Sequence, residues 1–497
     1  MTILNIALPD LVVSLKATNI QLEWIVDSYA VVTAGLLIFA GSLGDRIGRK
    51  ILLVAGLTVF AVGSIVSAFS SSVLMLIVGR AIMGAGSAFT MPATLSLITS
   101  MFRRQNERAL AIGIWSGTEG IGIALGPIAG GWLLAHFWWG SVFLINVPIA
   151  VIAAVSATLL IPNYKSSKKI RSDWTGVILS IVGISLFLWG IIEAPLSGWF
   201  SPEVIIPLLV GAFGMFLFMF WEFKSSHPML ETALFKKARF SAALASEGLI
   251  IFVLMGLLFL MTQYLQFSLG FTPFAAGIRI LPVAIVLGVA APVSTFIDKL
   301  LGTKLTVAGA MLIIALGCYM LSFTTIYSSY NDVLIGLIVV GLGSGLAFPP
   351  ATESVMGSLK AENTGVGSAS NSASMQLGGA LGVGVIGTAL ISRYQGSLSG
   401  MLVGHNIPPQ AMAIIKGSLG GALAVAHIAG GRSGILLALA AKISFIGGMD
   451  LGLRVGAAVA VLSAISALIF LPSRSEHVKL ETSRLIHRRA EDVSESR

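Results

Sequence analysis

The chain has 497 residues, of which 56% are hydrophobic and only 11% are charged. A soluble domain carries about a quarter charged residues, and a single soluble core stops growing at roughly 250–300 residues, so this composition excludes one soluble globular domain. The net charge of +9 would suit a nucleic-acid-binding protein. The basic residues, however, lie in short segments between apolar runs, which indicates a membrane protein that binds lipid and no nucleic acid.

The apolar runs predict the transmembrane helices. A helix needs about 20 mostly apolar residues to cross a bilayer. Thirteen runs are long enough, and residues 1–15 resemble the end of one more, so we predict an all-α polytopic membrane protein with fourteen spans, the first of them incomplete. The complete predicted spans are 22–43, 50–69, 73–98, 109–134, 141–161, 174–194, 203–222, 241–266, 273–297, 303–325, 333–357, 364–391 and 452–472.

The distribution of Lys and Arg predicts the orientation of these spans. The loops after the even-numbered spans are basic, with Arg46, Arg103 and Lys165 as examples, whereas the short loops between them hold almost no Lys or Arg except Lys16. Basic loops stay in the cytoplasm. We therefore expect both termini to be cytoplasmic.

One long loop, residues 393–445, is expected on the outer side. It contains apolar patches such as 419–429, but these patches are short and rich in glycine. A segment of this length does not cross a bilayer. We expect an amphipathic or hairpin-like insertion here.

The loop between the second and third predicted spans combines glycines with charges. Glycines allow a tight turn and a close approach of helices. The acid of this loop can cap the next helix or pair with a neighbouring arginine, and such a pair would join helices that move against each other. The alternative is an ordinary basic loop. The residues concerned are Gly41, Gly44, Asp45, Arg46, Gly48 and Arg49.

Residues 41–50 closely resemble the cytoplasmic loop signature of the major facilitator superfamily. The resemblance implies two related, pseudo-symmetric halves of six helices, and a weaker copy of the motif, with Asp298, follows the tenth predicted span. Spans seven and eight then form an inserted pair. The implied organisation is an N-terminal six-helix bundle (1–161), a cytoplasmic linker (162–173), the inserted pair (174–222), a cytoplasmic loop (223–240), a C-terminal six-helix bundle (241–472) that contains the outer loop, and a basic tail (473–497).

The fifth predicted span carries a stripe of glycines. Gly122, Gly126 and Gly130 recur every four residues, which predicts a flat surface for a neighbouring helix. Pro127 removes one N–H group and bends or loosens the helix. With Gly131, this run resembles the antiporter signature of the exporting branches of the superfamily. Close packing alone is the alternative interpretation, and it is compatible with export.

The fourth predicted span contains Arg80. An arginine in hydrocarbon costs at least ~2.5–3.5 kcal/mol and needs a partner unless it reaches the membrane surface, which is the alternative here. The residue resembles the fourth-span arginine of the superfamily, which is implicated in proton handling, although Met83 replaces the usual glutamine. Asp27, in a segment that resembles the second span of quaternary-ammonium exporters, is the expected partner. A carboxylate that alternates between pairing and burial can exchange a proton.

Three further acids lie within predicted spans and are functional candidates by position. Glu119 shares a helical face with the glycine stripe, Glu247 lies at mid-depth in the ninth span, and Glu353 lies near the inner end of the twelfth. Structural pairing is the alternative for each. The excess of acids over buried bases predicts a cavity that attracts lipophilic cations. Trp115 and Tyr264 are candidates for cation–π contacts, with core packing as the alternative.

Motifs that resemble this superfamily follow in order from Met1 to about residue 395, and together they are similar to the fourteen-span drug:proton antiporters. The resemblance implies a monomeric, proton-coupled exporter of amphipathic, cationic compounds in a bacterial plasma membrane, with a site that is exposed alternately to each side. Asp27 and Glu119 rank first as proton sites. That branch has an aspartate two residues before the position of Thr2, so we expect the first span to be incomplete as written.

The sequence also bears on two other functions. An uptake symporter of the same fold is the alternative, and the glycine–proline run of the fifth span argues against it. A membrane-embedded enzyme would need His, Asp or Cys in metal-ligand spacing, but all six His are expected in loops or the tail, and there is one cysteine. No Gly-Lys-Ser/Thr phosphate-binding string occurs. We therefore expect no metal, no cofactor and no ATP site.

Overall fold

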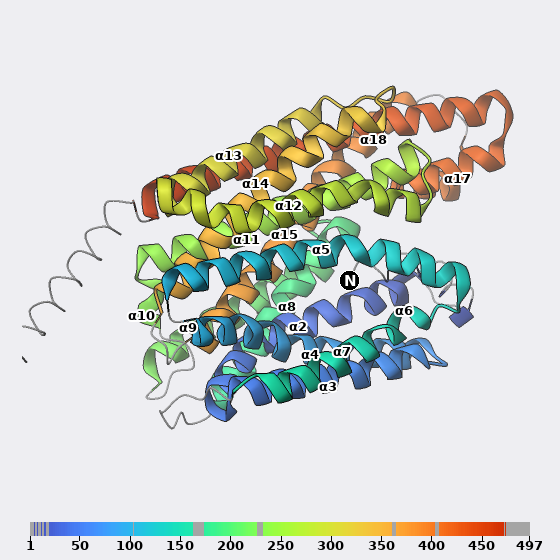
Figure 1. Cartoon of the computed structure of the whole chain (residues 1–497). Coiled ribbons are helices and arrows are strands. Elements are labelled where there is room, and N and C mark those ends of the chain that lie inside the picture. The colour runs from blue at the N-terminus through green and yellow to red at the C-terminus, as the bar shows by residue number, and fades with distance from the viewer. Residues whose placement is uncertain are drawn as a thin grey trace, which may run out of the picture.

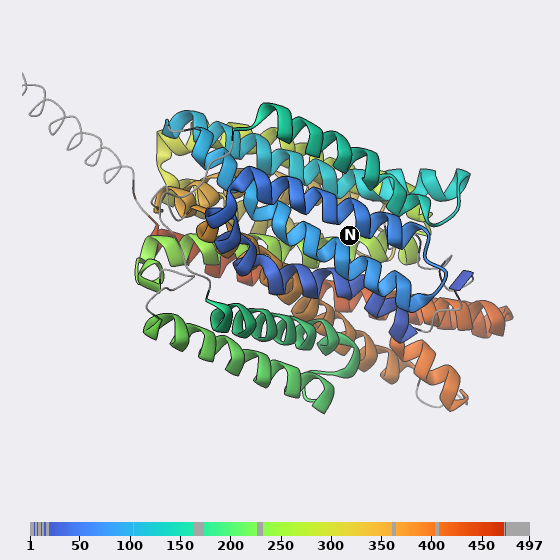
Figure 2. The same ribbon diagram turned by 90° about the horizontal axis from the view of Figure 1, so that it is seen from below.

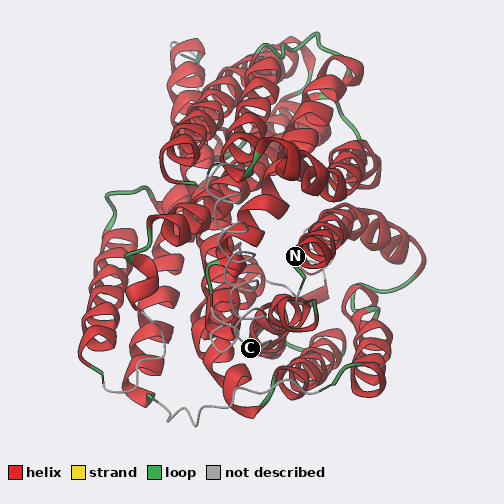
Figure 3. Cartoon of the chain, turned by 60° about the vertical axis from the view of Figure 1, so that its left-hand side comes forward, coloured by secondary structure: helices red, strands yellow, loops and turns green. Residues whose placement is uncertain are grey.

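The computed structural model describes residues 4, 7, 11, 14, 15, 19–102, 104–162, 173–225, 232–359, 364–402, 407–471 and 473. Within these residues every regular element is a helix (Figure 3). Twelve of these helical segments are long and apolar enough to cross a membrane. The prediction of an all-α polytopic membrane protein is confirmed, whereas the count of fourteen spans stays a prediction.

A first group of helices comes from the N-terminal part of the chain (Figure 1). Its members are α2 (Asn19–Ile47), α3 (Arg49–Ala68), α4 (Val73–Met101), α5 (Gln105–His136), α6 (Ser141–Leu144) and α7 (Asn146–Leu160). Helices α2, α3 and α4 pack closely together, and α7 covers α3. Helix α5 has 32 residues and packs mainly against the second group.

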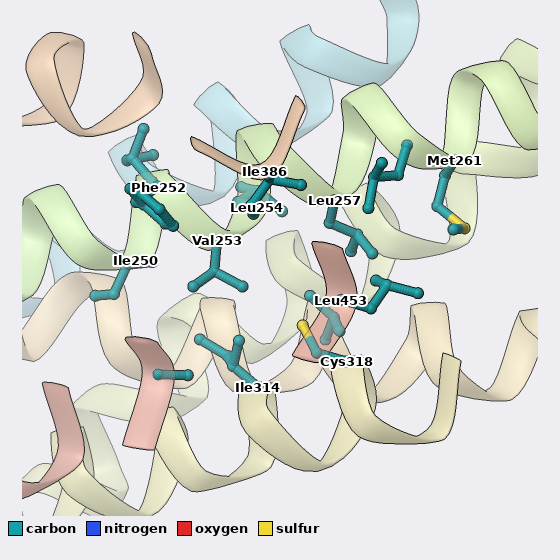
Figure 4. Packing of buried hydrophobic residues seen from close by; sticks show 14 of the residues in the cluster. Ile250, Phe252, Val253, Leu254, Leu257, Met261, Ile314, Cys318, Ile386 and Leu453 are labelled. Carbon is teal, nitrogen blue, oxygen red and sulfur yellow. The ribbon is translucent and has the colours of Figure 1, made fainter. Parts of the chain in front are cut away.

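The second group comes from the C-terminal part of the chain. Its members are α10 (Thr232–Phe235), α11 (Ala238–Gln263), the π-helix η1 (Tyr264–Ser268), α12 (Pro273–Leu301), α13 (Thr303–Ser322), α14 (Tyr330–Gly357), α15 (Thr364–Met401), α16 (Pro409–Gly417), α17 (Leu419–Ala429) and α18 (Gly431–Phe470). The largest buried apolar cluster lies here. Figure 4 shows Leu257, Cys318, Ile386 and Leu453, from four different helices, converging in this cluster.

Two helices stand between the groups in the sequence and at the edge of the bundle in space. Helices α8 (Trp174–Ser197) and α9 (Pro202–Lys224) form an antiparallel pair, drawn in green in Figure 2. Helix α8 contacts α2 of the first group and α15 of the second. The two groups themselves meet along two interfaces, one of α2 and α4 with α15 and one of α5 with α12 and α14.

Glycines with positive φ separate consecutive helices at two related places. Gly48, at φ 110°, lies between α2 and α3, and Gly302, at φ 83°, lies between α12 and α13. A residue with a side chain is strained at such angles. Each glycine follows an aspartate of the preceding helix, Asp45 or Asp298. We call the end of the bundle with the α2–α3 turn the Asp45 end and the opposite end the Trp24 end.

The prediction of a loop over 393–445 is wrong. Helix α15 continues to Met401, and α18 begins at Gly431, with α16 and α17 between them (Figure 1). The 40 residues of α18 extend about 60 Å, twice the hydrocarbon thickness of about 30 Å, so the predicted span 452–472 covers only its second half. A window set to the length of one span therefore misses a helix that continues beyond the membrane.

Candidate functional site

At the Asp45 end, the buried Asp45 joins three helices. The Arg49 guanidinium donates to Asp45 Oδ1, with Nη2 at 2.9 Å and Nε at 3.2 Å, so the predicted ion pair is present. The backbone N–H of Val366, in the first turn of α15, donates to Asp45 Oδ2 at 3.3 Å. An acid is stabilised at a helix N-terminus by the free N–H groups and the helix dipole. Arg46 is half-buried in the last turn of α2.

Small residues let α2 and α15 approach closely beside Asp45. A Cβ at Gly41 would lie 2.5 Å from the Cβ of Ala369, and a Cβ at Gly365 would lie 2.5–2.6 Å from the Asp45 carboxylate. Gly44 packs in the same way on Leu52 of α3, where a Cβ would lie 2.8 Å from Cδ2. These positions therefore require glycine for close packing. The sequence motif predicts this for Gly41 and Gly44 but does not include Gly365.

Helix α4 also holds the start of α15. Ser368 donates to the carbonyl oxygen of Pro92 at 2.8 Å, and the hydroxyls of Ser96 and Thr364 are 3.3 Å apart. Arg49 donates to Ser100 of α4 as well. Two helices of the first group thus contact the first turns of α15.

A second set of charges joins the groups through α5 and α14. Arg108 Nε lies 3.1 and 3.0 Å from the two carboxylate oxygens of Glu353. Arg239 of α11 donates to Ser354 at 3.2 Å. Asp298 is half-buried and forms a hydrogen bond with the side chain of Thr303. It also interacts electrostatically with Glu353 and Arg239. The predicted candidate Glu353 therefore lies in an ion pair between the groups.

Toward the Trp24 end, Arg80 is buried between α4 and α2. Its Nε donates to the carbonyl oxygen of Ile25 at 3.0 Å, and its Nη2 donates to that of Val26 at 3.4 Å. Its guanidinium carbon lies 4.6 Å from the centroid of the Tyr29 ring. Only 3% of Arg80 is exposed, and the half-buried Asp27 acts on it electrostatically. The arginine is therefore held by α2 and does not reach the protein surface.

Glu247 is fully buried in the second group. Thr352 of α14 donates a hydrogen bond to its Oε1. Thr352 directly precedes Glu353, so adjacent residues of α14 contact a buried acid and the ion pair with Arg108. The side chains of Glu119 and Pro127 lie outside the described residues.

In the first half of α5, the glycines that contact α12 are not those that were predicted. A Cβ at Gly113 would lie 3.1 Å from the Ala291 carbonyl oxygen, and one at Gly117 would lie 3.0 Å from that of Gly288. A Cβ at Gly122 would meet no atom within 4 Å, so its predicted role in close packing is wrong. Five residues turn a helix by about 140° beyond a full turn, which moves Gly122 off the face of Gly117.

The remaining predicted glycines of α5 lie closer to the bundle. Gly126 is half-buried and Gly130 is buried. Gly131 lies at the Trp24 end, where a Cβ would be 3.0 Å from the ring of Phe274. The α5–α12 contact therefore extends from Gly113 to the far end of α5.

The two aromatic candidates pack in the interior. Tyr264 is fully buried and donates to the Ser328 carbonyl oxygen at 3.3 Å, so its ring offers no surface to a cation. Trp115 is partly buried against the large apolar cluster. Among the described residues, no three His, Cys, Asp or Glu side chains lie together as metal ligands.

Arg108, Arg239 and Thr352 belong to the site, but no pattern in the sequence marks them as site residues. Arg108 is visible in the sequence only as one of several basic loop residues that indicate the orientation. Their partners lie up to 245 residues away in the sequence, and spacing along one helix does not indicate such contacts.

Comparison with known proteins assigns the family. The model of the Major Facilitator Superfamily matches residues 1–383. The chain belongs to this superfamily. The methyl viologen resistance protein SmvA of Salmonella typhimurium is 31% identical over 466 residues, which cover 93% of each chain. The multidrug efflux pump LfrA of Mycolicibacterium smegmatis is 32% identical over 466 residues, which cover 94% of this chain and 91% of LfrA.

A solved structure shows the same superfamily fold. The crystal structure of the human organic anion transporter MFSD10 is similar with a TM-score of 0.56 and 11% sequence identity, over 93% of this chain and 88% of that chain. Membership of the superfamily and the efflux proteins among its relatives make the chain a multi-pass membrane transporter and not an enzyme.

Proposed function

We propose that this superfamily member exports amphipathic, cationic drugs or toxic compounds in exchange for protons. The observation that carries the proposal is the Asp45 site, where the Val366 N–H, Arg49 and a close glycine contact join the two groups of helices at the Asp45 end of the α2–α15 interface. Two groups that separate at one end while they close at the other expose a central site alternately to the two sides of the membrane.

The names of relatives support the direction and the substrate class. SmvA is named for resistance to methyl viologen, which is a dication, and LfrA is named as a multidrug efflux pump. Resistance follows from export and not from uptake. We therefore extend to this chain the export of cationic compounds, with a proton gradient as the driving force and no cofactor.

The proton sites that we propose are Asp27, Glu119 and Glu247. Asp27 acts electrostatically on the buried Arg80, and Glu247 is fully buried and accepts a hydrogen bond from Thr352. A carboxylate in a low-dielectric site changes its protonation when its partner or its contact with water changes. Protonation removes the negative charge that attracts a cation, so proton binding promotes release of the substrate.

The distribution of charge supports the orientation. Basic residues of the described chain gather at the Asp45 end, which we assign to the cytoplasm together with both termini. The basic residues at this end are Arg46, Arg49, Lys50, Arg104, Arg108, Lys224, Lys236, Lys237, Arg239, Lys299 and Lys304. We also propose that the protein is a monomer in a bacterial plasma membrane.

Everted membrane vesicles from a bacterial host without its own efflux pumps test the proposal. An imposed proton gradient is expected to drive ethidium or methyl viologen into vesicles that contain the protein, and nigericin, which collapses the gradient, is expected to stop this movement. Asp27→Asn, Glu119→Gln and Glu247→Gln test the three acids. Movement that continues after the gradient collapses would refute proton coupling. Accumulation by intact cells would refute export in favour of uptake.

A further inference from the structure

The α8–α9 pair is attached to α2 at three levels. Three side-chain contacts join α8 to α2 between Trp174 and Trp189, and the pair lies at the edge of the bundle (Figure 2). The ring pairs Phe39–Trp174 and Trp24–Trp189 lie 6.4 and 5.2 Å apart between centroids. Between them, Ser185 packs on Gly35 and donates to the carbonyl oxygen of Val31 at 3.4 Å.

The polar contact of the pair with α15 lies at the Trp24 end. The indole N–H of Trp199, in the α8–α9 turn, donates to the Thr388 hydroxyl at 2.7 Å. That hydroxyl donates its own hydrogen to the carbonyl oxygen of Gly384 at 2.8 Å, which leaves a lone pair for the indole. One turn away, a Cβ at Gly384 would lie 3.2 Å from the carbonyl oxygen of Ile191 in α8.

The α2–α15 interface is therefore joined in two different ways. At the Asp45 end, α2 and α15 touch directly, through Gly41, Gly365 and Asp45. Thr388 lies 24 residues after Thr364, or about 36 Å along α15. Toward the Trp24 end, α8 and the turn after it contact both α2 and α15.

We propose that the α8–α9 pair is a movable side wall that stays on α2 and closes the Trp24 end by a releasable contact with α15, made by Trp199 on Thr388 and by Ile191 on Gly384. This inference rests on the proposed function, because transport requires α2 and α15 to separate at this end. Attachment to α2 at three levels makes the pair move with the first group. The contact with α15 at the Trp24 end is then the one that breaks.

Two disulfide cross-links separate the moving contact from the fixed one. Both are built on a Cys318→Ala background, because Cys318 is the chain's one cysteine. Ile191→Cys with Gly384→Cys joins α8 to α15, and oxidation is expected to lower transport by about tenfold or more, since the two groups can no longer separate. Reduction should restore transport. This recovery distinguishes the cross-link from a folding defect.

The matched control joins α8 to α2 through Gly35→Cys with Ser185→Cys. Oxidation of this pair is expected to leave transport within about twofold of the reduced protein, because α8 and α2 move together. Full activity of the oxidised 191–384 pair would overturn the proposal. Equal inactivation by both cross-links would overturn it as well.

Spin-label distances provide a readout that does not depend on transport. Labels on the exposed Ser197 and Gln21 report α8 against α2, and labels on Ser197 and the exposed Ser392 report α8 against α15. Between acidic and alkaline pH, and with methyl viologen added, the 197–392 distances should change while the 197–21 distances stay constant. A constant 197–392 distance under all conditions contradicts the wall. If the 197–392 distance changes but the protein transports none of the tested compounds, the result supports the movable side wall. It then refutes only the proposed function.

Trp199→Phe and Thr388→Val test the hydrogen bond itself. Each removes one partner and preserves most of the side-chain volume. The two variants should change the transport rate by the same factor and in the same direction, and the double variant should match either one, because partners in one hydrogen bond are not additive. Independent, multiplied effects would show that the two residues do not act through this bond.

Discussion

Arg108 of α5 and Glu353 of α14 form a forked ion pair between the two groups of helices, with Nε 3.0 and 3.1 Å from the two carboxylate oxygens. The residue before Glu353 is Thr352, which donates to the buried Glu247. A shift of α14 at this point therefore changes the surroundings of Glu247 and the ion pair together. This arrangement links a proposed proton site to a contact that closes the Asp45 end.

The first prediction concerns this ion pair. Removing one partner of a buried pair costs roughly 3–5 kcal/mol, and the cost is smaller here because Arg108 and Glu353 are 20% and 10% exposed. Arg108→Gln and Glu353→Gln should each lower dye efflux by about tenfold, which corresponds to a free-energy loss of about 1.4 kcal/mol. The double variant Arg108→Glu with Glu353→Arg, which exchanges the two charges, should recover part of the lost efflux.

The control for this pair lies one turn away. Arg104 and Glu107 also form an ion pair, but their side chains are 85% and 50% exposed. Exposed pairs contribute about 0–1 kcal/mol, so Arg104→Gln should leave efflux within roughly twofold of the parent. Equal losses for Arg104→Gln and Arg108→Gln would show that general charge, and not the contact between groups, sets the rate.

The second prediction concerns Gly365. A methyl group at this position would overlap the Asp45 carboxylate, so Gly365→Ala should displace Asp45 from the N-terminus of α15 and reduce efflux as Asp45→Asn does. Gly400→Ala, on the same helix, is the control, because a Cβ there meets no atom within 4 Å. Efflux assays at matched expression compare the three variants. Normal efflux by Gly365→Ala would remove the Asp45 site from the mechanism.

Local patterns in the sequence predicted much of the fold and one half of the Asp45 site. The helices follow from apolar runs of sufficient length. The charged loop predicted that Asp45 caps the next helix or pairs with Arg46 or Arg49, and the structure shows the pair with Arg49. The sequence could not indicate which helix donates a hydrogen bond to the second carboxylate oxygen of Asp45. Val366 is 321 residues away and contributes a backbone N–H, which every residue type except proline has.

Other differences have equally physical origins. The glycines of α5 occur on more than one face, and only packing selects Gly113 and Gly117 for α12. Arg80 needs a partner in a membrane, and the sequence suggested a carboxylate. The structure supplies the carbonyl oxygens of Ile25 and Val26 and the ring of Tyr29 in addition to the field of Asp27, and no side-chain pattern predicts a backbone acceptor.

The third prediction concerns Arg80. Its planar guanidinium reaches two carbonyl oxygens of α2 and covers the Tyr29 ring at the same time. A lysine has one ammonium group and cannot make both hydrogen bonds in that geometry. Arg80→Lys should therefore lower efflux by about tenfold although the charge is kept, since each charged hydrogen bond contributes roughly 1.5–3 kcal/mol.

The control for Arg80 is Arg454→Lys. Arg454 is paired with Asp450 on α18 and is 57% exposed, so the exchange should change efflux little. Purified Arg80→Lys should also unfold at a lower temperature than Arg454→Lys, because its loss includes buried contacts between α2 and α4. Identical efflux and melting temperature in the two variants would mean that the geometry around Arg80 does not matter.

The fourth prediction separates two glycines of α5. Gly117→Val places a branched side chain where even a Cβ lies 3.0 Å from the Gly288 carbonyl oxygen, whereas Gly122→Val meets open space. Overpacking costs about 1–3 kcal/mol, so Gly117→Val should lower the melting temperature and efflux, and Gly122→Val should keep the melting temperature of the parent. Measuring both quantities on both variants then decides what the antiporter-like run does. If Gly122→Val remains stable but loses efflux, Gly122 serves another state of the transport cycle, in which α5 has turned or moved toward a neighbour. If it keeps both, the close contact of α5 with α12 does not require Gly122.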